Sequence, residues 1–224
     1  MVFKNLVNFF QGLIEYRDFI EHGHFTSVSI VVLIALLTAI IQAWGMLKQS
    51  KKIWQNQSGE TLPLTFFAFQ FFYFMSYLIY GIKIGSGSII LNNLVGFFFL
   101  PIIAGLIKFK LKENGSFRKE LLFSPFFVLV IPCILFIKEE WSLLVVLVLA
   151  LFVFTHLVRE LFRTKKVRNI EPRFILSIIA GSSIWLFYGW KIGDFGIAIS
   201  SGTTIIGGMF FYYYYRRFKS QDTF

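Results

Sequence analysis

Seven apolar stretches, each close to the length that crosses a lipid bilayer, constrain this chain more than any other feature. A membrane-spanning helix needs about 20 mostly apolar residues, because the hydrocarbon core is about 30 Å thick. A helix also satisfies its own backbone hydrogen bonds, which lipid cannot do. We therefore expect an all-α integral membrane protein with seven transmembrane helices. The predicted helices occupy residues 27–47, 64–82, 88–107, 121–137, 141–161, 173–190 and 195–215.

The composition agrees with a membrane protein and argues against a soluble one. Of the 224 residues, 56% are hydrophobic and 15% are charged, whereas soluble domains have about 25% charged residues. The formal net charge of +10 comes from short basic clusters between the apolar stretches. No basic face of a soluble domain is therefore available to bind nucleic acid, and we do not expect a nucleic-acid partner.

The basic residues predict the orientation of the helices. Most of the 22 lysines and arginines follow the first, third, fifth and seventh predicted helices. Basic loops are retained on the cytoplasmic side, so we expect an extracytoplasmic N-terminus and a cytoplasmic C-terminus, in the plasma or inner membrane rather than an organelle. The residues on this side are Lys48, Lys51, Lys52, Lys108, Lys110, Lys112, Arg118, Lys119, Arg159, Arg163, Lys165, Lys166, Arg168, Arg173, Arg216, Arg217 and Lys219.

A sequence repeat divides the chain into two similar parts. Residues 77–93 and 185–201 are identical at seven of 17 positions, at an offset of 108 residues. Each copy begins near the end of the second helix in a set of three. Both copies point the same way across the membrane, because the second copy begins four helices after the first. Parallel repeats of this kind place a substrate site near the midplane, between the two halves.

The repeat implies a division of the chain into five segments. Pro125 and Pro132 predict a kink in the fourth helix, which links the two units. The first segment has apolar residues at near-helical spacing, as in a helix that lies on the membrane surface. The segments are an N-terminal amphipathic or interfacial segment (1–26), a first three-helix repeat (27–110), a linker with the fourth helix (111–140), a second three-helix repeat (141–218) and a short cytoplasmic tail (219–224).

Short motifs recur at matching positions of the two units. A segment of aromatic residue, two residues, Tyr and Gly ends the second helix of each unit, and a small polar residue follows that Tyr by 13 positions. After the first helix, Lys48-Gln49 is followed by Ser58-Gly59 at the entrance to the second helix. The paired segments are Tyr77 to Gly81 with Asn93, and Trp185 to Gly189 with Ser201.

These motifs resemble those of the PQ-loop superfamily, most of all its SWEET-type sugar transporters, which have seven helices in a three-plus-one-plus-three arrangement. The glutamine of the family's Pro-Gln pair is kept as Gln49, and Lys48 stands at the place of the hinge proline. The resemblance implies a substrate pocket lined by Tyr77, Asn93, Trp185 and Ser201. It implies motif or gating roles for Gln49, Tyr80, Gly81, Tyr188 and Gly189. Gly45 would supply flexibility in the first helix in place of the hinge proline, or would be a helix-packing residue.

The chemistry of these residue types suits a polar solute. The Asn93 amide offers a donor and an acceptor, and an aromatic face such as that of Trp185 can stack on a sugar ring or a cation. Two other interpretations stay open: Asn93 would form an interhelical hydrogen bond, and Trp185 would belong to an interfacial aromatic belt. Gln42 and Gln70, within the first and second helices, would line the path or pin neighbouring helices.

Two titratable residues are candidates for proton coupling. His156 lies in the fifth helix near its cytoplasmic end, and Asp194 lies beside Lys191 in an outer loop. An ionisable group within a span is a proton-relay hypothesis; interfacial packing of His156 and a solvated ion pair of Asp194 are the other interpretations. Cys133 is the sole cysteine, and no cluster has the spacing of metal ligands. We expect neither a metal nor a cofactor.

The sequence favours a facilitative, uniport-like transporter of a small polar solute, with a sugar as the first candidate, that works by alternating access between two three-helix bundles. Two other functions stay open: a proton-coupled exporter of an amino acid or metabolite, and a non-transporting seven-helix cargo receptor or scaffold. No catalytic constellation appears, so we do not expect an enzyme. The expected partners are the solute and the lipid bilayer. One chain holds both units, and a homo-oligomer is left open.

Overall fold

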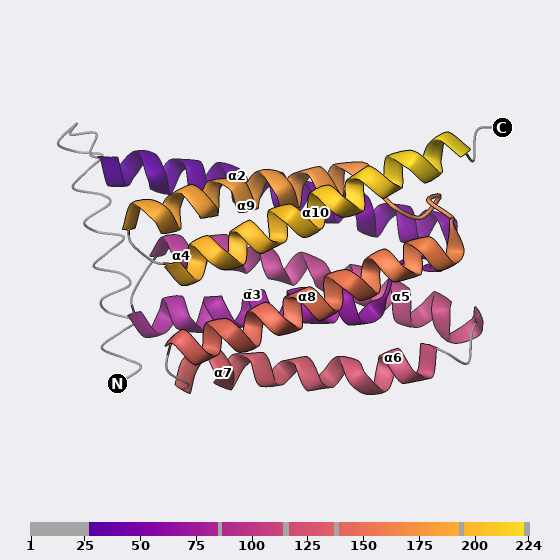
Figure 1. The fold of residues 1–224 in the computed structure, drawn as a ribbon, viewed down its shortest axis with the longest axis horizontal. Coiled ribbons are helices and arrows are strands. Elements are labelled where there is room, and N and C mark those ends of the chain that lie inside the picture. The colour runs from indigo at the N-terminus through magenta and orange to yellow at the C-terminus, as the bar shows by residue number, and fades with distance from the viewer. Residues whose placement is uncertain (1–26, 85–86, 114–116, 137–138, 193–194, 222–224) are drawn as a thin grey trace.

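The computed structural model describes residues 27–84, 87–113, 117–136, 139–192 and 195–221, which are helical apart from short connections (Figure 1). The predicted N-terminal segment, 1–26, lies outside the described residues. Two 3₁₀ turns, Leu94–Phe98 and Ser124–Leu129, join α4 to α5 and α6 to α7. The helices are α2 (Ser27–Asn56), α3 (Leu64–Ile84), α4 (Gly87–Asn93), α5 (Phe99–Glu113), α6 (Phe117–Phe123), α7 (Val130–Phe136), α8 (Glu139–Thr164), α9 (Pro172–Ile192) and α10 (Phe195–Gln221).

Five described helical stretches are long and apolar enough to cross a membrane. This confirms an all-helical chain of the multi-pass membrane type. Helices also occupy the other two predicted ranges, as α2 and as the series α6 to α7. The break in that series falls where the sequence predicts it, because the 3₁₀ turn carries Pro125, which has no N–H to continue an α-helical ladder. The five stretches are Leu64–Ile82, Ile89–Leu111, Val145–Thr164, Pro172–Trp190 and Phe195–Ser220.

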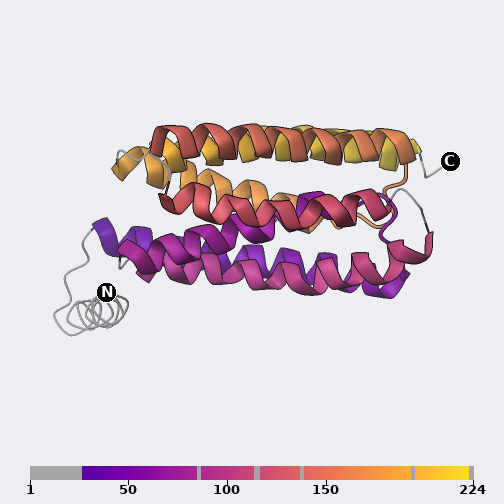
Figure 2. The same ribbon diagram turned by 90° about the horizontal axis from the view of Figure 1, so that it is seen from below.

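Each three-helix unit places its third helix between the other two. In the first unit, α4 and α5 pack against both α2 and α3, and in the second unit α10 packs against both α8 and α9. Across the units, α2 packs on α9 and α3 packs on α8, while α7 contacts both α3 and α8. Figure 2 shows α2 to α5 largely on one side of the molecule and α8 and α10 on the other. The equivalent pairing of first and second helices gives the contact between units an approximate twofold symmetry.

The backbone extends the repeat beyond the stretch in which the sequence reveals it. Gln57 and Lys165, 108 positions apart, both have a φ of 51°, which few residues other than glycine adopt. Each directly follows the first helix of its unit, α2 or α8. A left-handed residue at this position is a common way to end a helix. The two units therefore end their first helices in the same way, although the surrounding sequences differ.

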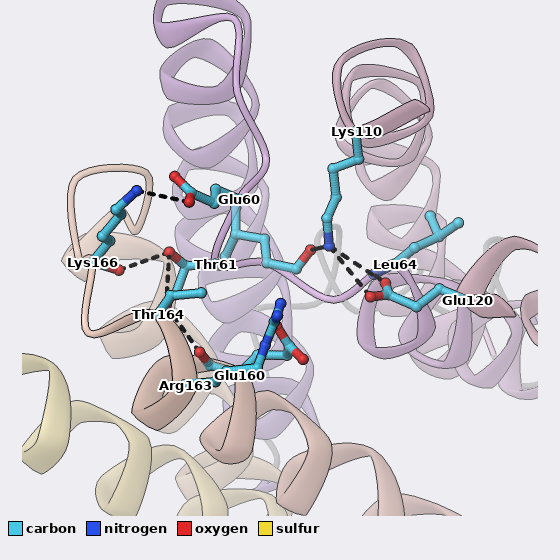
Figure 3. Close-up of polar contacts among 10 residues, drawn as sticks. Glu60, Thr61, Leu64, Lys110, Glu120, Glu160, Arg163, Thr164 and Lys166 are labelled. Atoms are coloured by element: carbon cyan, nitrogen blue, oxygen red, sulfur yellow. Dashed lines mark hydrogen bonds and ion pairs between the residues drawn. The ribbon is translucent and has the colours of Figure 1, made fainter. Parts of the chain in front are cut away.

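The structure gathers the predicted cytoplasmic segments at one end, which we call the basic end. It contains the ends of α2, α5, α8 and α10 and the beginnings of α6 and α9 (Figure 1, at the end marked C). The linker helix α6 is anchored here to the first unit. Glu120 accepts a hydrogen bond of 2.7 Å from the backbone N–H of Leu64, at the start of α3, and Lys110 donates one of 3.0 Å to the carbonyl of Leu62. Lys110 and Glu120 pair with each other at 3.4 Å (Figure 3).

Replacing Lys110 with methionine should destabilise the protein. Lys110 is 5% exposed, and methionine keeps its length while removing the charge, so that Glu120 would stay largely buried without its cation. Loss of one partner from a buried pair costs about 3 kcal/mol, and we expect the midpoint of thermal unfolding in detergent to fall by several degrees. Lys119→Met is the matched control, because Lys119 is exposed on α6. An equal fall in both variants would contradict a stabilising role for the pair.

Candidate functional site

A cavity with an empty volume of about 700 Å³ lies between the two three-helix units. This volume includes space that is open to solvent. Its walls come from α2, α3, α4, α5, α9 and α10, and the polar groups in its described lining are carboxamides, hydroxyls and one indole, all neutral. The lining consists of Gln42, Met46, Gln70, Tyr73, Phe74, Tyr77, Ile89, Asn92, Asn93, Phe99, Ile178, Ser182, Trp185, Ile197, Ser200, Ser201 and Thr204. We refer to it as the central cavity.

The four residues that the resemblance nominated as pocket residues lie together in this lining. Tyr77 on α3 and Asn93 on α4 come from the first unit, and Trp185 on α9 and Ser201 on α10 come from the second. Ser201 and Asn93 are buried. Their proximity follows from the packing of α2 on α9, which brings the second and third helices of the two units around one space.

The structure shows a local hydrogen bond for Asn93. Its amide nitrogen donates 2.7 Å to the carbonyl of Ile89, one turn back on α4. This bond lies where α4 passes into the 3₁₀ turn Leu94–Phe98, so the side chain supports the irregular backbone there. The neighbouring Asn92 also lines the central cavity and is 5% exposed. Sequence reasoning overlooked Asn92, although a second asparagine in a membrane helix is itself a sign of a polar path.

Tyrosines on α3 form a row beside the cavity and reach across to the second unit. The Tyr73 and Tyr77 rings lie 4.9 Å apart, and Tyr77 contacts Tyr80 at 6.3 Å. Tyr73 donates its hydroxyl proton to the Ser200 hydroxyl at 3.1 Å, which joins α3 to α10. In the second unit, Trp185 packs edge-on against Tyr188 at 5.1 Å. Tyr73 and Ser200 were not predicted as site residues, because their pairing depends on how the units dock.

An aromatic layer separates the central cavity from the basic end. The Phe67 ring lies 5.6 Å from Phe174 and 6.3 Å from Phe99, so rings from α3, α9 and α5 meet at one level. All three side chains are buried. The layer borders a smaller apolar space, which shares Ile178 with the central cavity and has Gln49 in its wall. A polar solute in the central cavity would therefore have to pass this layer to reach the basic end.

Gln49 holds the two units together at the basic end. Its amide nitrogen donates 2.8 Å to the carbonyl of Asn169, and its carbonyl oxygen accepts 2.8 Å from the backbone N–H of Glu171. Both partners lie in the segment that leads into α9, and Gln49 is fully buried. At the repeat position of Gln49, 108 residues later, the second unit has the apolar Leu157. The contact, which we call the Gln49 clamp, is therefore made by one unit only.

Further polar contacts between the units surround the clamp. Lys52 donates 2.7 Å to the carbonyl of Ile170 and lies 3.8 Å from the Glu171 carboxylate. Burial lowers the pKa of Lys52, and the Glu171 charge partly opposes this shift. Figure 3 shows the neighbouring pairs, in which Lys166 contacts Glu60 at 2.7 Å and the hydroxyl of Thr61 donates 2.7 Å to the carbonyl of Lys166. Together these contacts close the basic end.

Two of the three candidate gating glycines, Gly45 and Gly81, lie at close helix contacts. A Cβ atom at Gly45 would overlap the side chain of Ser177, so this glycine lets α2 approach α9. A Cβ atom at Gly81 would come within 3.0 Å of Ile89, at the turn from α3 to α4. Gly189 is buried on α9. The structure therefore shows packing positions for Gly45 and Gly81, and a hinge role for Gly45 stays a prediction.

Of the two coupling candidates, His156 is described and does not line the central cavity. His156 lies on α8 outside the cavity lining, and its Nε2 atom is buried without a hydrogen-bond partner among the described residues. Asp194 lies outside the described residues. The site that the structure presents is thus the neutral central cavity.

Comparisons with known proteins agree with this geometry. Residues 29–109, which span the first three-helix unit, match the family model described as "Sugar efflux transporter for intercellular exchange". The solved structure of a eukaryotic SWEET transporter has a similar fold, with a TM-score of 0.53 and 18% sequence identity. The similarity covers 86% of this chain and 100% of that one. A search of the curated proteins found no match. The resemblance to the SWEET-type PQ-loop proteins is confirmed in sequence for the first unit and in fold for both.

Proposed function

We propose that this chain carries a small polar solute across a membrane, with a sugar as the first candidate. The chain resembles SWEET-type transporters in sequence and fold, which supports a transporter rather than an enzyme. The proposal includes seven membrane-spanning helices in a three-plus-one-plus-three arrangement, with the segment boundaries expected from the sequence. One observation carries it: the central cavity lies between the two repeats and has a neutral, polar and aromatic lining. Sites at a repeat interface are typical of carriers of this construction.

Alternating access is the mechanism that the contacts support. The Gln49 clamp, the Lys52 and Lys166 contacts and the aromatic layer all join the units on the basic side of the central cavity. Opening toward the basic end would require these contacts to separate. Separation of the units would expose these polar groups to water, which can replace their hydrogen bonds and ion pairs, so the second state need not be much higher in free energy. The described conformation is the one closed at the basic end.

The neutral lining of the central cavity supports facilitative transport. The described polar groups of the cavity are carboxamides, hydroxyls and an indole, which do not titrate near neutral pH. A solute bound among them would not require a proton. The excess of basic residues supports a cytoplasmic basic end and a cytoplasmic C-terminus, and the proposal includes the plasma or inner membrane as the location.

Uptake into proteoliposomes tests this function. We expect the purified protein to take up radiolabelled glucose or sucrose in a saturable way, at a rate that an imposed pH gradient does not change. Liposomes without protein give the background, and labelled alanine tests the amino-acid alternative. Uptake that depends on the gradient would replace facilitative transport with proton coupling. Folded protein that takes up none of these solutes would favour the receptor or scaffold function instead.

A further inference from the structure

Three polar atoms in the lining of the central cavity are buried without a hydrogen-bond partner among the described residues. They are the amide oxygens of Gln42 and Asn92 and the indole nitrogen of Trp185. Gln42 and Asn92 are each 5% exposed. A buried polar group that lacks a partner costs about 1–3 kcal/mol, and exceptions of this kind in a native structure often mark function. Here all three atoms belong to one cavity and come from three helices, α2, α4 and α9.

Packing holds Gln42 in this position. A Cβ atom at Gly181 would overlap the Gln42 side-chain amide, so the absence of a side chain at residue 181 lets the amide lie directly against α9. About one turn further along α2, toward the basic end, Gly45 allows the same close approach at Ser177. The two glycines thus place the Gln42 amide at the seam between the units, where the central cavity begins.

The polar groups of the cavity differ between the two units. The first unit contributes four carboxamides, from Gln42, Gln70, Asn92 and Asn93, and the second contributes four aliphatic hydroxyls, from Ser182, Ser200, Ser201 and Thr204. At the repeat positions of Asn92 and Asn93 stand Ser200 and Ser201. A carboxamide offers a fixed acceptor and a fixed donor, whereas a hydroxyl rotates to suit its partner. The first unit therefore forms the side of the cavity that can select a solute by the positions of its hydrogen-bond donors.

The three atoms without hydrogen-bond partners among the described residues determine which solutes can bind in the central cavity. Two carbonyl oxygens accept hydrogen bonds, and the indole N–H donates one. A sugar hydroxyl can serve either role. A carboxylate would place its charge beside two carbonyl oxygens, and an ammonium group would be buried without a counter-ion in the described lining, which costs several kcal/mol. The arrangement therefore favours a neutral solute that carries several hydroxyls.

We propose that Gln42 and Asn92 are additional specificity-determining residues, which select a neutral polyhydroxylated solute by accepting hydrogen bonds from two of its hydroxyls. This inference rests on the proposed transport function and goes further by assigning the solute class to two residues. It also predicts that the solute binds in one orientation, with its hydroxyl donors toward the first unit.

The test measures the half-saturation concentration of glucose uptake in proteoliposomes, or of sucrose uptake if sucrose is the solute transported. We expect Gln42→Met and Asn92→Leu each to raise this concentration about three- to tenfold, which corresponds to the loss of one hydrogen bond, with little change in the maximal rate. Thr65→Val is the matched control. Thr65 has a buried hydroxyl oxygen without a partner among the described residues but lies outside the cavity lining, so its removal should leave uptake unchanged.

Monodeoxy derivatives of the same sugar separate recognition from packing. In the wild-type protein we expect at least two of them to bind three- to tenfold more weakly. Each variant should bind the derivative that lacks the hydroxyl recognised by the replaced residue as tightly as it binds the parent sugar. A purely structural effect of the substitution would not produce this result. Independent, multiplying losses for every derivative would overturn the proposal, as would unchanged half-saturation in both variants.

The outcomes for the two proposals can be told apart. If the wild-type protein takes up no solute, the transport function fails. If it transports sugar and the variants behave like wild type, only the roles of Gln42 and Asn92 fail. Uptake of alanine but of neither sugar would keep a carrier and overturn the neutral polyhydroxylated class. If a variant does not fold, the monodeoxy derivatives still test the proposal with wild-type protein. Equal affinity of the wild-type protein for the parent sugar and for all derivatives would overturn the proposal.

Discussion

Replacing Gln49 with leucine should open the basic end of this protein. Both polar ends of the Gln49 side chain bond to the backbone of the second unit, and the residue is fully buried. Leucine would leave the carbonyl of Asn169 and the N–H of Glu171 buried without this partner, at about 1–3 kcal/mol each. Leucine is also the residue at the repeat position in the second unit, Leu157, so the change suits the packing of this fold.

Thiol labelling measures this opening. Ile178 borders both the central cavity and the smaller apolar space that has Gln49 in its wall. Cys133 is the sole native cysteine. In a background with Cys133→Ser and Ile178→Cys, we expect Gln49→Leu to raise the rate of labelling by a charged maleimide from the basic side more than tenfold. Gln55→Leu, at an exposed position of the same helix, is the matched control. Equal labelling rates for wild type and Gln49→Leu would show that the clamp does not control access.

Replacing Trp185 with alanine should nearly abolish solute uptake. Trp185 lines the central cavity from α9 and holds an indole N–H without a hydrogen-bond partner among the described residues. Its removal would take away both an aromatic surface and a donor, together about 2–3 kcal/mol. We expect the half-saturation concentration to rise roughly 30- to 150-fold.

Two further variants show which property of Trp185 matters. Trp185→Phe keeps an aromatic ring and loses the donor, so we expect it to retain an intermediate affinity. Trp190→Ala is the matched control, because Trp190 lies on the same helix and is 72% exposed, where it would contact lipid. If Trp190→Ala and Trp185→Ala impair uptake equally, the effect would come from the membrane interface, as the belt interpretation of Trp185 predicts.

Much of the fold could be predicted from the sequence because membrane helices are specified locally. An apolar stretch of sufficient length must be helical in lipid, whatever its neighbours are. The resemblance to SWEET-type transporters, carried by motifs within residues 77–93 and 185–201, then nominated Tyr77, Asn93, Trp185 and Ser201 as pocket residues. These four residues share one cavity lining. A repeat carries this information because equivalent positions in two docked units lie around the same axis.

The residues that were overlooked are those whose roles depend on a partner. Asn92 is adjacent to the predicted Asn93, and only the orientation of α4 shows that Asn93 bonds to its own helix while the Asn92 oxygen has no partner among the described residues. Glu120 falls in the predicted linker (111–140), and it accepts a hydrogen bond from the backbone N–H of Leu64 at the start of α3. No periodic pattern marks such residues, because each is a single polar side chain opposite a single backbone group.

The sequence by itself determined the helical membrane class, the repeat at residues 77–93 and 185–201 and the short basic clusters between apolar stretches. These properties follow from apolar length, charge and repetition, which are read along the chain. Only the tertiary structure decided that Gln49 bonds to Asn169 and Glu171, more than one hundred residues away, and that this closes the basic side of the central cavity. A hydrogen bond needs its two groups within about 3 Å, and that precision arises only when whole helices have packed.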